Sequence, residues 1–161
     1  MRPDDYKYSE SHEWIKYNEK KKEATIGITD YAVKQLADLV HIDLPKVGDN
    51  VEQGAPFGEI ESVKTVADLI TPLTGKIIEV NKDISGNLDT LKEEPFEDGW
   101  LIRIKPSDPA ELEALMTKKE YEDSDMDDLK QRISAHFGEF VTGELRQMVK
   151  AIEGLRGERW D

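Results

Sequence analysis

A lysine near the middle of the run GEIESVKTVAD stands in a context that suits covalent chemistry. The run extends from Gly58 to Asp68 and predicts a strand, a tight turn and a second strand, which places Lys64 near the turn. A lysine there presents a primary amine on a flexible stem, and such an amine is suited to acylation by a carrier group. Because a lysine at a strand turn is most often only a solvated charge, the assignment depends on the rest of the chain.

The sequence offers little support for catalysis by the protein's own side chains. The absence of cysteine excludes disulfides, thiolate metal sites and cysteine nucleophiles, so any redox chemistry has to come from a bound cofactor. The histidines His12, His41 and His136 are not spaced as metal ligands, and no Gly-rich phosphate loop or supported Ser-His-Asp order is present. Glu59 and Glu61 share one face of a strand, where neighbouring carboxylates are often only solvated. We therefore expect a cofactor-bearing carrier rather than an enzyme.

Composition limits the partners and the compartment. The 161 residues suit one domain with an appendage, and 35 acidic against 22 basic residues give a net charge of -13. This charge disfavours a nucleic-acid binder, which needs cations to neutralise phosphates. The first residues, MRPDD, lack the apolar core of a signal peptide, and no apolar run approaches the roughly 20 residues that span a bilayer. We expect a cytoplasmic protein with no nucleic-acid and no membrane partner.

Hydrophobic periodicity predicts a mainly β domain with one helix early in the chain. Thr29 is placed to cap a helix that extends to Asp38. In the next segment Val40, Ile42 and Leu44 alternate with polar residues, which predicts a half-buried strand with these three side chains on one face. Further strands are predicted over residues 6–8, 14–17, 24–28 and 75–80, and an irregular, partly helical connection over 84–91.

The end of this domain is predicted to be a strand followed by a helix. Trp100, Ile102 and Ile104 alternate with the intervening residues and predict the closing strand. Asp108 is then placed to cap a helix, and Glu111, three residues later, completes an arrangement similar to a capping box.

Two short runs repeat the same spacing of proline and glycine. PKVGDNV at residues 45–51 matches PLTGKII at 72–78, and in each the proline ends a strand and the glycine makes a turn before the next strand. The Lys64 hairpin lies between them in the sequence. This arrangement predicts a pseudo-two-fold β-sandwich or flattened barrel.

The last part of the chain has a different pattern. Residues 120–128 form an acidic segment that we interpret as a linker, and apolar residues at helical spacing follow it. We expect a domain over 1–123 and a helical C-terminal extension over 124–161. The extension could pack on its own protein or on a copy of itself, or it could dock onto a partner enzyme.

Four separated runs, in this order, resemble one known family. They are SHEW at residues 11–14, ATIGITDYA at 24–32, ESVK at 61–64 and GWLIRIKP at 99–106. From about residue 8 to 121 the chain resembles the H protein of the glycine cleavage system, a lipoyl carrier. The resemblance implies a lipoyl/biotinyl-type hammerhead β-sandwich (a flattened barrel) with terminal helices. The chain departs from the family where Leu88, rather than proline, follows Asn87, and where it continues beyond the family's usual end.

The resemblance also implies roles for individual residues. Lys64 would carry covalent lipoate. The loaded arm would dock in a cleft of the same protein, where carboxylates suit its amine. The positions that match the arm-docking residues are Ser11, Glu13 and Asp68, and those that match the residues recognised during lipoylation are Glu61 and Gly75. Glu61 could contact the ligase directly, whereas Gly75 would set the backbone of its hairpin.

The partners implied are the enzymes of the glycine cleavage system. Glycine decarboxylase (P protein) would load an aminomethyl group onto the arm, aminomethyltransferase (T protein) would receive it, and dihydrolipoyl dehydrogenase (L protein) would reoxidise the dithiol; a lipoyl ligase or transferase would attach the lipoate. Two alternatives stay open. One is a related lipoyl carrier that serves another pathway, such as sulfur oxidation by heterodisulfide-reductase-like complexes. The other is an unmodified binding or assembly module.

Overall fold

The computed structural model describes residues 2–124. By its internal contacts the chain divides into two units, Met1–Lys119 and Glu120–Asp161, and only residues 120–124 of the second unit are described. The predicted boundary between residues 123 and 124 stays a prediction, and the predicted helices beyond it lie outside the described residues. Residues 118–124 are helical, so the segment that we interpret as an acidic linker begins within a helix.

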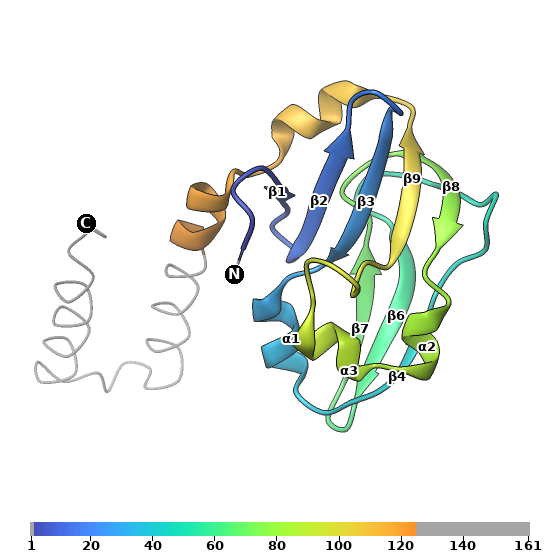
Figure 1. Ribbon diagram of the computed structural model, residues 1–161, viewed down its shortest axis with the longest axis vertical. Coiled ribbons are helices and arrows are strands. Elements are labelled where there is room, and N and C mark those ends of the chain that lie inside the picture. The colour runs from blue at the N-terminus through green and yellow to red at the C-terminus, as the bar shows by residue number, and fades with distance from the viewer. Residues whose placement is uncertain (1, 125–161) are drawn as a thin grey trace, which may run out of the picture. The chain divides into compact units, whose positions relative to one another are not determined.

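Two antiparallel sheets form the first unit (Figure 1). The larger sheet has the strand order β1-β2-β3-β9-β8-β5. Its strands are β1 (Lys7–Tyr8), β2 (Glu13–Asn18), β3 (Glu23–Ile28), β5 (Asn50–Val51), β8 (Gly75–Val80) and β9 (Ile102–Pro106). The smaller sheet has the order β4-β6-β7, with β4 (Leu39–Asp43), β6 (Pro56–Ser62) and β7 (Val66–Ile70).

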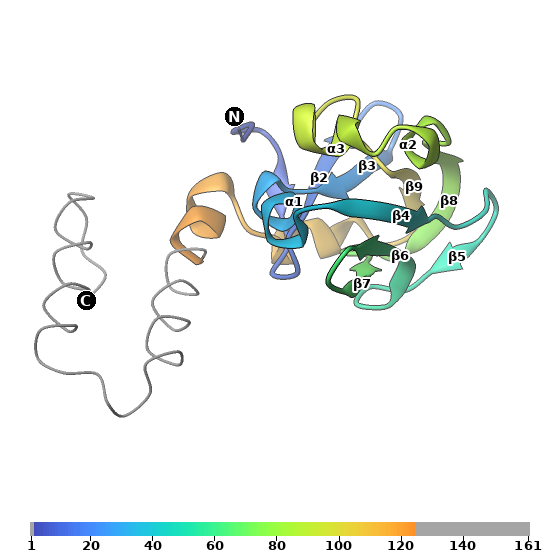
Figure 2. The same cartoon turned by 90° about the horizontal axis from the view of Figure 1, so that it is seen from below.

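The two sheets lie as separate layers (Figure 2), so the predicted flattened sandwich is confirmed. Successive residues of a strand point to opposite faces, and the end of β6 shows this alternation. Ile60 and Ser62 are buried whereas Glu59 and Glu61 are exposed. The inner faces form one apolar core, which includes Ile15, Ile26, Ile42, Ile60, Leu69, Ile77, Leu101 and Ile104.

Short helices close one end of the sandwich (Figure 1). They are α1 (Asp30–Leu36), α2 (Asp83–Gly86) and α3 (Asp89–Glu93), and a 3-10 helix, η1 (Pro109–Ala114), follows β9. The Thr29 side chain caps α1 as predicted, because it accepts a hydrogen bond from Ala32 N. The helix ends at Leu36, two residues before the predicted end, since the backbone of Ala37 turns to a φ of 62°.

An aromatic cluster covers part of the outer face of the larger sheet. Trp14 is buried between Tyr6 and Phe96, and the Tyr6 and Trp14 ring centroids are 5.0 Å apart. Gly27 lies opposite Trp14 in the β2–β3 ladder, and a Cβ at Gly27 would lie 2.5 Å from the indole. A glycine is therefore required at this position for the tryptophan to lie flat on the sheet.

Two strand patterns differ from the alternation read in the sequence. The pairing of β4 with β6 shifts register between Leu39 and His41, and this bulge turns Val40 outward, so the expectation that Val40 shares the buried face of Ile42 is wrong. The closing strand begins only at Ile102. Trp100 is half-buried and lies outside the strand, where the Arg103 guanidinium stacks 4.2 Å from its ring centroid.

Glu111 does not complete a capping box, which corrects the prediction. Asp108 does cap η1, because its carboxylate accepts a hydrogen bond from Ala110 N. Glu111 turns away from the helix and binds the strand connection, where it accepts hydrogen bonds from Thr74 N at 2.7 Å and Thr74 Oγ1 at 2.8 Å. The carboxylate thereby joins η1 to the start of β8.

The N-terminal strand has a partner from the far end of the unit. Tyr8 and Met116 form an isolated antiparallel bridge with two backbone hydrogen bonds of 2.8 Å. The bridge covers β1, the outermost strand on that side of the larger sheet. In residues 2–124, no helix is long and apolar enough to cross a membrane.

Candidate functional site

Lys64 lies in the turn of the β6–β7 hairpin, and its side chain is exposed. The strands pair in register from Glu59 opposite Asp68 to Glu61 opposite Val66. The turn therefore occupies only the few residues between Ser62 and Val66. The predicted strand–turn–strand is confirmed, and the hairpin presents Lys64 at its tip, at the same end of the sandwich as α1 (Figure 1).

Hydrogen bonds hold this turn in one conformation. Ser62 N donates to Thr65 O at 2.8 Å, and the buried Ser62 side chain accepts from Thr65 N at 3.2 Å. A third bond joins the turn to the segment before β4, since Val63 N donates to Asp38 O at 2.9 Å. These contacts engage the backbone on both sides of Lys64 and leave the lysine side chain to move by its own torsions.

The Lys64 amine makes no ion pair within residues 2–124. An exposed amine on a hairpin whose backbone is fixed fits an acyl group in amide linkage, because acylation would break no ion pair among residues 2–124. The residues present at the turn therefore fit a covalently attached carrier arm.

Carboxylates line the outer face of the smaller sheet below the turn. Glu59 and Asp68 are directly opposite each other on β6 and β7, and Glu61 lies one step closer to Lys64, opposite Val66. All three carboxylates are exposed, and none forms an ion pair in the described part of the chain. Like charges directly opposite each other destabilise a sheet, which leaves this face favourable for a cationic partner group.

A second polar cluster surrounds Glu13 at the start of β2. Glu13 is only 2% exposed. Its Oε1 accepts a hydrogen bond from Ser9 Oγ at 2.8 Å and another from Ser11 Oγ. Ser9 Oγ in turn accepts from Glu13 N at 3.0 Å, so the buried Ser9 hydroxyl is hydrogen-bonded to both the backbone amide and the side-chain carboxyl group of Glu13. This fixes the plane of the carboxyl group.

Burial changes the acidity of this carboxyl group. Desolvation raises the pKa of Glu13 from its ordinary 4.5 to about 7, and the hydrogen bonds from Ser11, Ser9 and the Ile70 amide oppose the rise by stabilising the charged form. Glu13 is therefore close to half ionised at neutral pH. A cation brought to its free acceptor positions would favour the ionised form and be held by it.

The structure joins Glu13 to the strand that carries Asp68. Ile70 N on β7 lies 3.4 Å from Glu13 Oε2, and Asp68 is two residues earlier on the same strand. Three residues separate Lys64 from Asp68, so the two lie at most about 13 Å apart along the chain. Ser11 and Glu13 are thus in direct contact, whereas Asp68 meets them only through β7.

Gly75 begins β8 in the larger sheet, away from the β6–β7 turn in the ladder. It is paired with Val51 and Pro106, and a Cβ at this position would lie 2.3 Å from Lys105 O. The expectation that Gly75 makes a turn before the strand is wrong, because Gly75 is already paired within β8; Gly48, by contrast, is in a turn with a φ of 100°. Gly75 instead permits the close approach of β8 to β9.

Ser9, which hydrogen-bonds Glu13, is a residue of this cluster that was not predicted from the sequence. Nothing in the run YSESHEW distinguishes its hydroxyl from that of Ser11. Only the turn between β1 and β2 does so, where His12 adopts a φ of 70° and His12 N donates to Ser9 O. This turn folds Ser9 back under Glu13.

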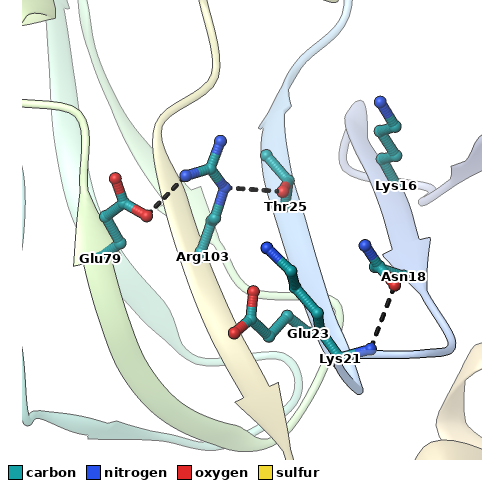
Figure 3. Close-up of a pocket in the computed structure, with 7 residues that line it drawn as sticks. All are labelled: Lys16, Asn18, Lys21, Glu23, Thr25, Glu79 and Arg103. Atoms are coloured by element: carbon teal, nitrogen blue, oxygen red, sulfur yellow. Dashed lines mark hydrogen bonds and ion pairs between the residues drawn. The ribbon is translucent and has the colours of Figure 1, made fainter.

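A hollow of about 390 Å³ lies on the outer face of the larger sheet (Figure 3). Arg103 on β9 crosses it, with Nε donating to Thr25 Oγ1 at 3.2 Å and the guanidinium paired with Glu79. Lys16 and Lys21 border the same hollow together with Glu23. Cations and anions alternate here, so the hollow lacks the single-sign field that would select a charged ligand.

The sequence and the fold both match proteins of one family. The family model described as Glycine cleavage H-protein matches residues 6–128. The glycine cleavage system H protein of Halalkalibacterium halodurans is 46% identical over 121 residues, which cover 75% of this chain and 93% of that protein. The Bacillus subtilis protein of the same name is 43% identical over 126 residues, covering 78% and 98%. The crystal structure of a glycine cleavage system H protein from Mycobacterium marinum aligns with a TM-score of 0.68 and 39% identity, covering 74% of this chain and 95% of that one. The chain described here therefore belongs to the glycine cleavage H-protein family.

Proposed function

We propose that this protein carries lipoate in amide linkage on Lys64 and serves the glycine cleavage system. The observation that carries the proposal is the turn itself: a single exposed lysine, without an ion pair in residues 2–124, stands at the tip of a hairpin fixed by hydrogen bonds to Thr65 and Asp38. Membership of the H-protein family supports the identity of the acyl group.

The protein's own residues would present and shelter the arm. Bound lipoate would supply the thiol–disulfide chemistry and the attachment point for the aminomethyl group. Glu13 offers an ionisable carboxyl group, fixed by Ser9 and Ser11, to a cationic amine. Asp68 adds an exposed carboxylate on the strand between Lys64 and that group. Holding the amine among buried groups would exclude water from it.

The proposed partners are glycine decarboxylase, aminomethyltransferase and dihydrolipoyl dehydrogenase. One tethered arm that visits each enzyme replaces free diffusion of an intermediate with a high effective concentration. The protein is thus a substrate of its partner enzymes. Its own residues would supply the surfaces on which these enzymes dock and the site that shelters the loaded arm.

The first experiment is acylation of the full chain. We would incubate the protein with a lipoyl ligase, ATP and lipoate, and measure intact mass and the mass of the Lys64 peptide. One lipoyl group on that peptide is expected, with none on Lys64→Arg. Lys22→Arg, in the exposed turn between β2 and β3, is the matched control and should be modified like wild type. An unmodified wild-type chain would refute the carrier proposal.

A second experiment tests the pathway. The lipoylated protein would be combined with the three glycine cleavage enzymes, and glycine-dependent reduction of NAD would be followed. Turnover comparable to that of a known H protein is expected. A lipoylated protein that is reduced by dihydrolipoyl dehydrogenase but supports no glycine decarboxylation would assign the arm to another pathway.

A further inference from the structure

Large apolar side chains are rarely exposed on this protein, and the exceptions are concentrated around Lys64. Within residues 2–124 four large apolar side chains are exposed. Three of them are Val63 at 73%, Val66 at 56% and Val40 at 51%. Single exposed valines need no explanation, but three around one reactive lysine form a patch.

Strand pairing places the three valines together. Val63 directly precedes Lys64, and Val66 begins the second strand of the same hairpin, opposite Glu61. Val40 lies on β4 between Leu39, which is paired with Ser62, and His41, which is paired with Glu61. The three side chains therefore border the turn from β4, from the turn itself and from the start of β7, and we call them the valine collar.

The bulge in β4 is what brings Val40 into the collar. In a regular strand Val40 and Leu39 would point to opposite faces, and so would Val40 and His41. The register shift between Leu39 and His41 leaves both Val40 and His41 exposed. Bulges re-aim side chains, and here a side chain that regular alternation would bury is turned to the surface beside Lys64.

The enzyme that acylates Lys64 has to cover this surface. To form the amide it must bring its activated acyl group within bonding distance of Nζ, so it must contact the residues that flank the turn. An enzyme that acts on the far end of the finished arm has no such requirement. Glu61 adds a carboxylate within the collar, because it lies on the central strand β6 between His41 of β4 and Val66 of β7, and it has no ion pair among the residues that the structure describes.

We propose that the valine collar, Val40, Val63 and Val66, is the docking surface for the enzyme that attaches the acyl group to Lys64. The partner surface would be an apolar rim around the entrance of its acyl channel, with a basic residue facing Glu61. This inference rests on the proposed carrier function and adds which side chains the acylating enzyme recognises.

The test replaces valine by threonine, which keeps the β-branched shape and the strand preference but exchanges a methyl for a hydroxyl. We would measure kcat/KM for the protein substrate with a purified lipoyl ligase. Each of Val40→Thr, Val63→Thr and Val66→Thr should lower kcat/KM about five-fold, and the triple variant by more than 50-fold, mainly through KM.

Val47→Thr is the matched control. Val47 is the fourth exposed large apolar residue, at 60%, and it follows the other end of β4, beyond Asp43. It should be acylated like wild type. Acetylation of Lys64 by a small activated ester, followed by peptide mass, should be equal in all variants, because it depends on the amine and not on docking. Circular dichroism melts establish that each variant is folded.

The outcomes separate this inference from the proposed function. Loss of kcat/KM in the collar variants with unchanged chemical acetylation supports docking. A triple variant acylated at the wild-type rate, or an equal loss in Val47→Thr, overturns the collar while the carrier function stands. Normal acylation with impaired turnover by the glycine cleavage enzymes would also overturn it, because the collar would then serve a later partner. A wild-type chain that is not acylated would overturn both proposals.

Discussion

Replacing the buried Glu13 by glutamine should make the protein more stable at alkaline pH. Glu13 has a pKa of about 7 in the folded protein, whereas its ordinary value is 4.5. Between these two pH values the folded state binds more protons than the unfolded state, so the stability of the wild type falls as pH rises. Integrated from pH 4 to pH 8.5, the loss amounts to about 3 kcal/mol.

Glutamine has no charge to desolvate and should escape this loss. Its carbonyl oxygen can still accept the hydrogen bonds of Ser9 and Ser11. Its amide cannot accept from Ile70 N, a contact that is long at 3.4 Å, and losing it costs about 1 kcal/mol. The variant should therefore be less stable than wild type by about 1 kcal/mol at pH 4 and more stable by about 2 kcal/mol at pH 8.5.

The assay is urea unfolding followed by tryptophan fluorescence, at half-unit steps from pH 4 to pH 8.5. Plotted against pH, the difference in unfolding free energy between variant and wild type should change sign near pH 5 to 6. Glu59→Gln, at an exposed carboxylate on β6, is the control and should follow the wild-type curve. If the Glu13→Gln and wild-type curves run parallel, Glu13 does not titrate near neutrality and the argument from burial is wrong.

Three further substitutions test contacts described above. Ser9→Ala removes a donor to the charged form of Glu13, so the pKa of Glu13 should rise further, as measured by carbon-13 NMR of the side-chain carboxyl. Ser85→Ala, at an exposed position of α2, is the control and should leave this pKa unchanged. Gly75→Ala places a Cβ 2.3 Å from Lys105 O and should destabilise the protein by about 1–3 kcal/mol; a melting temperature equal to that of wild type would contradict the close approach of β8 and β9. Glu111→Ala removes both acceptor oxygens at Thr74 and should cost about 1–3 kcal/mol in urea unfolding, whereas Glu113→Ala, exposed on the same 3-10 helix, should cost little.

The sequence predicted the strands and the Lys64 turn because both depend on local patterns. Alternation marks a strand with one buried face, and the strand-forming residues on both sides of Lys64 in the run from Gly58 to Asp68 mark a hairpin. The N-cap at Thr29 was equally local. In each of these cases the residues that decide the structure are neighbours in the chain.

The errors arose where a distant segment decides. Val40 was expected on the buried face, but its outward direction depends on how β4 pairs with β6. Glu111 has the spacing of a capping-box residue, yet its carboxylate binds Thr74, which lies 37 residues earlier in the chain. Gly75 has the sequence context of a turn glycine, but its constraint comes from Lys105 O.

The burial of Glu13 also depends on a segment that is distant in the sequence. The residues from Ser9 to His12 that precede Glu13 are polar, which favours an exposed side chain, and its low exposure results from packing near β7. The resemblance to H proteins pointed to Ser11 and Glu13 but could not indicate the acidity of Glu13 or the contribution of Ser9. Both follow only from the three-dimensional contacts, while their role in holding an arm stays a prediction.

The bridge between Tyr8 and Met116 has a consequence for synthesis and engineering. β1 is made almost first, but the residue that covers its outer edge, Met116, is made more than 100 residues later. Until residue 116 has left the ribosome, the nascent sheet exposes backbone donors and acceptors that another chain could pair with. A protein truncated before residue 116 should therefore self-associate during expression, whereas fusions placed beyond the bridge leave that edge protected.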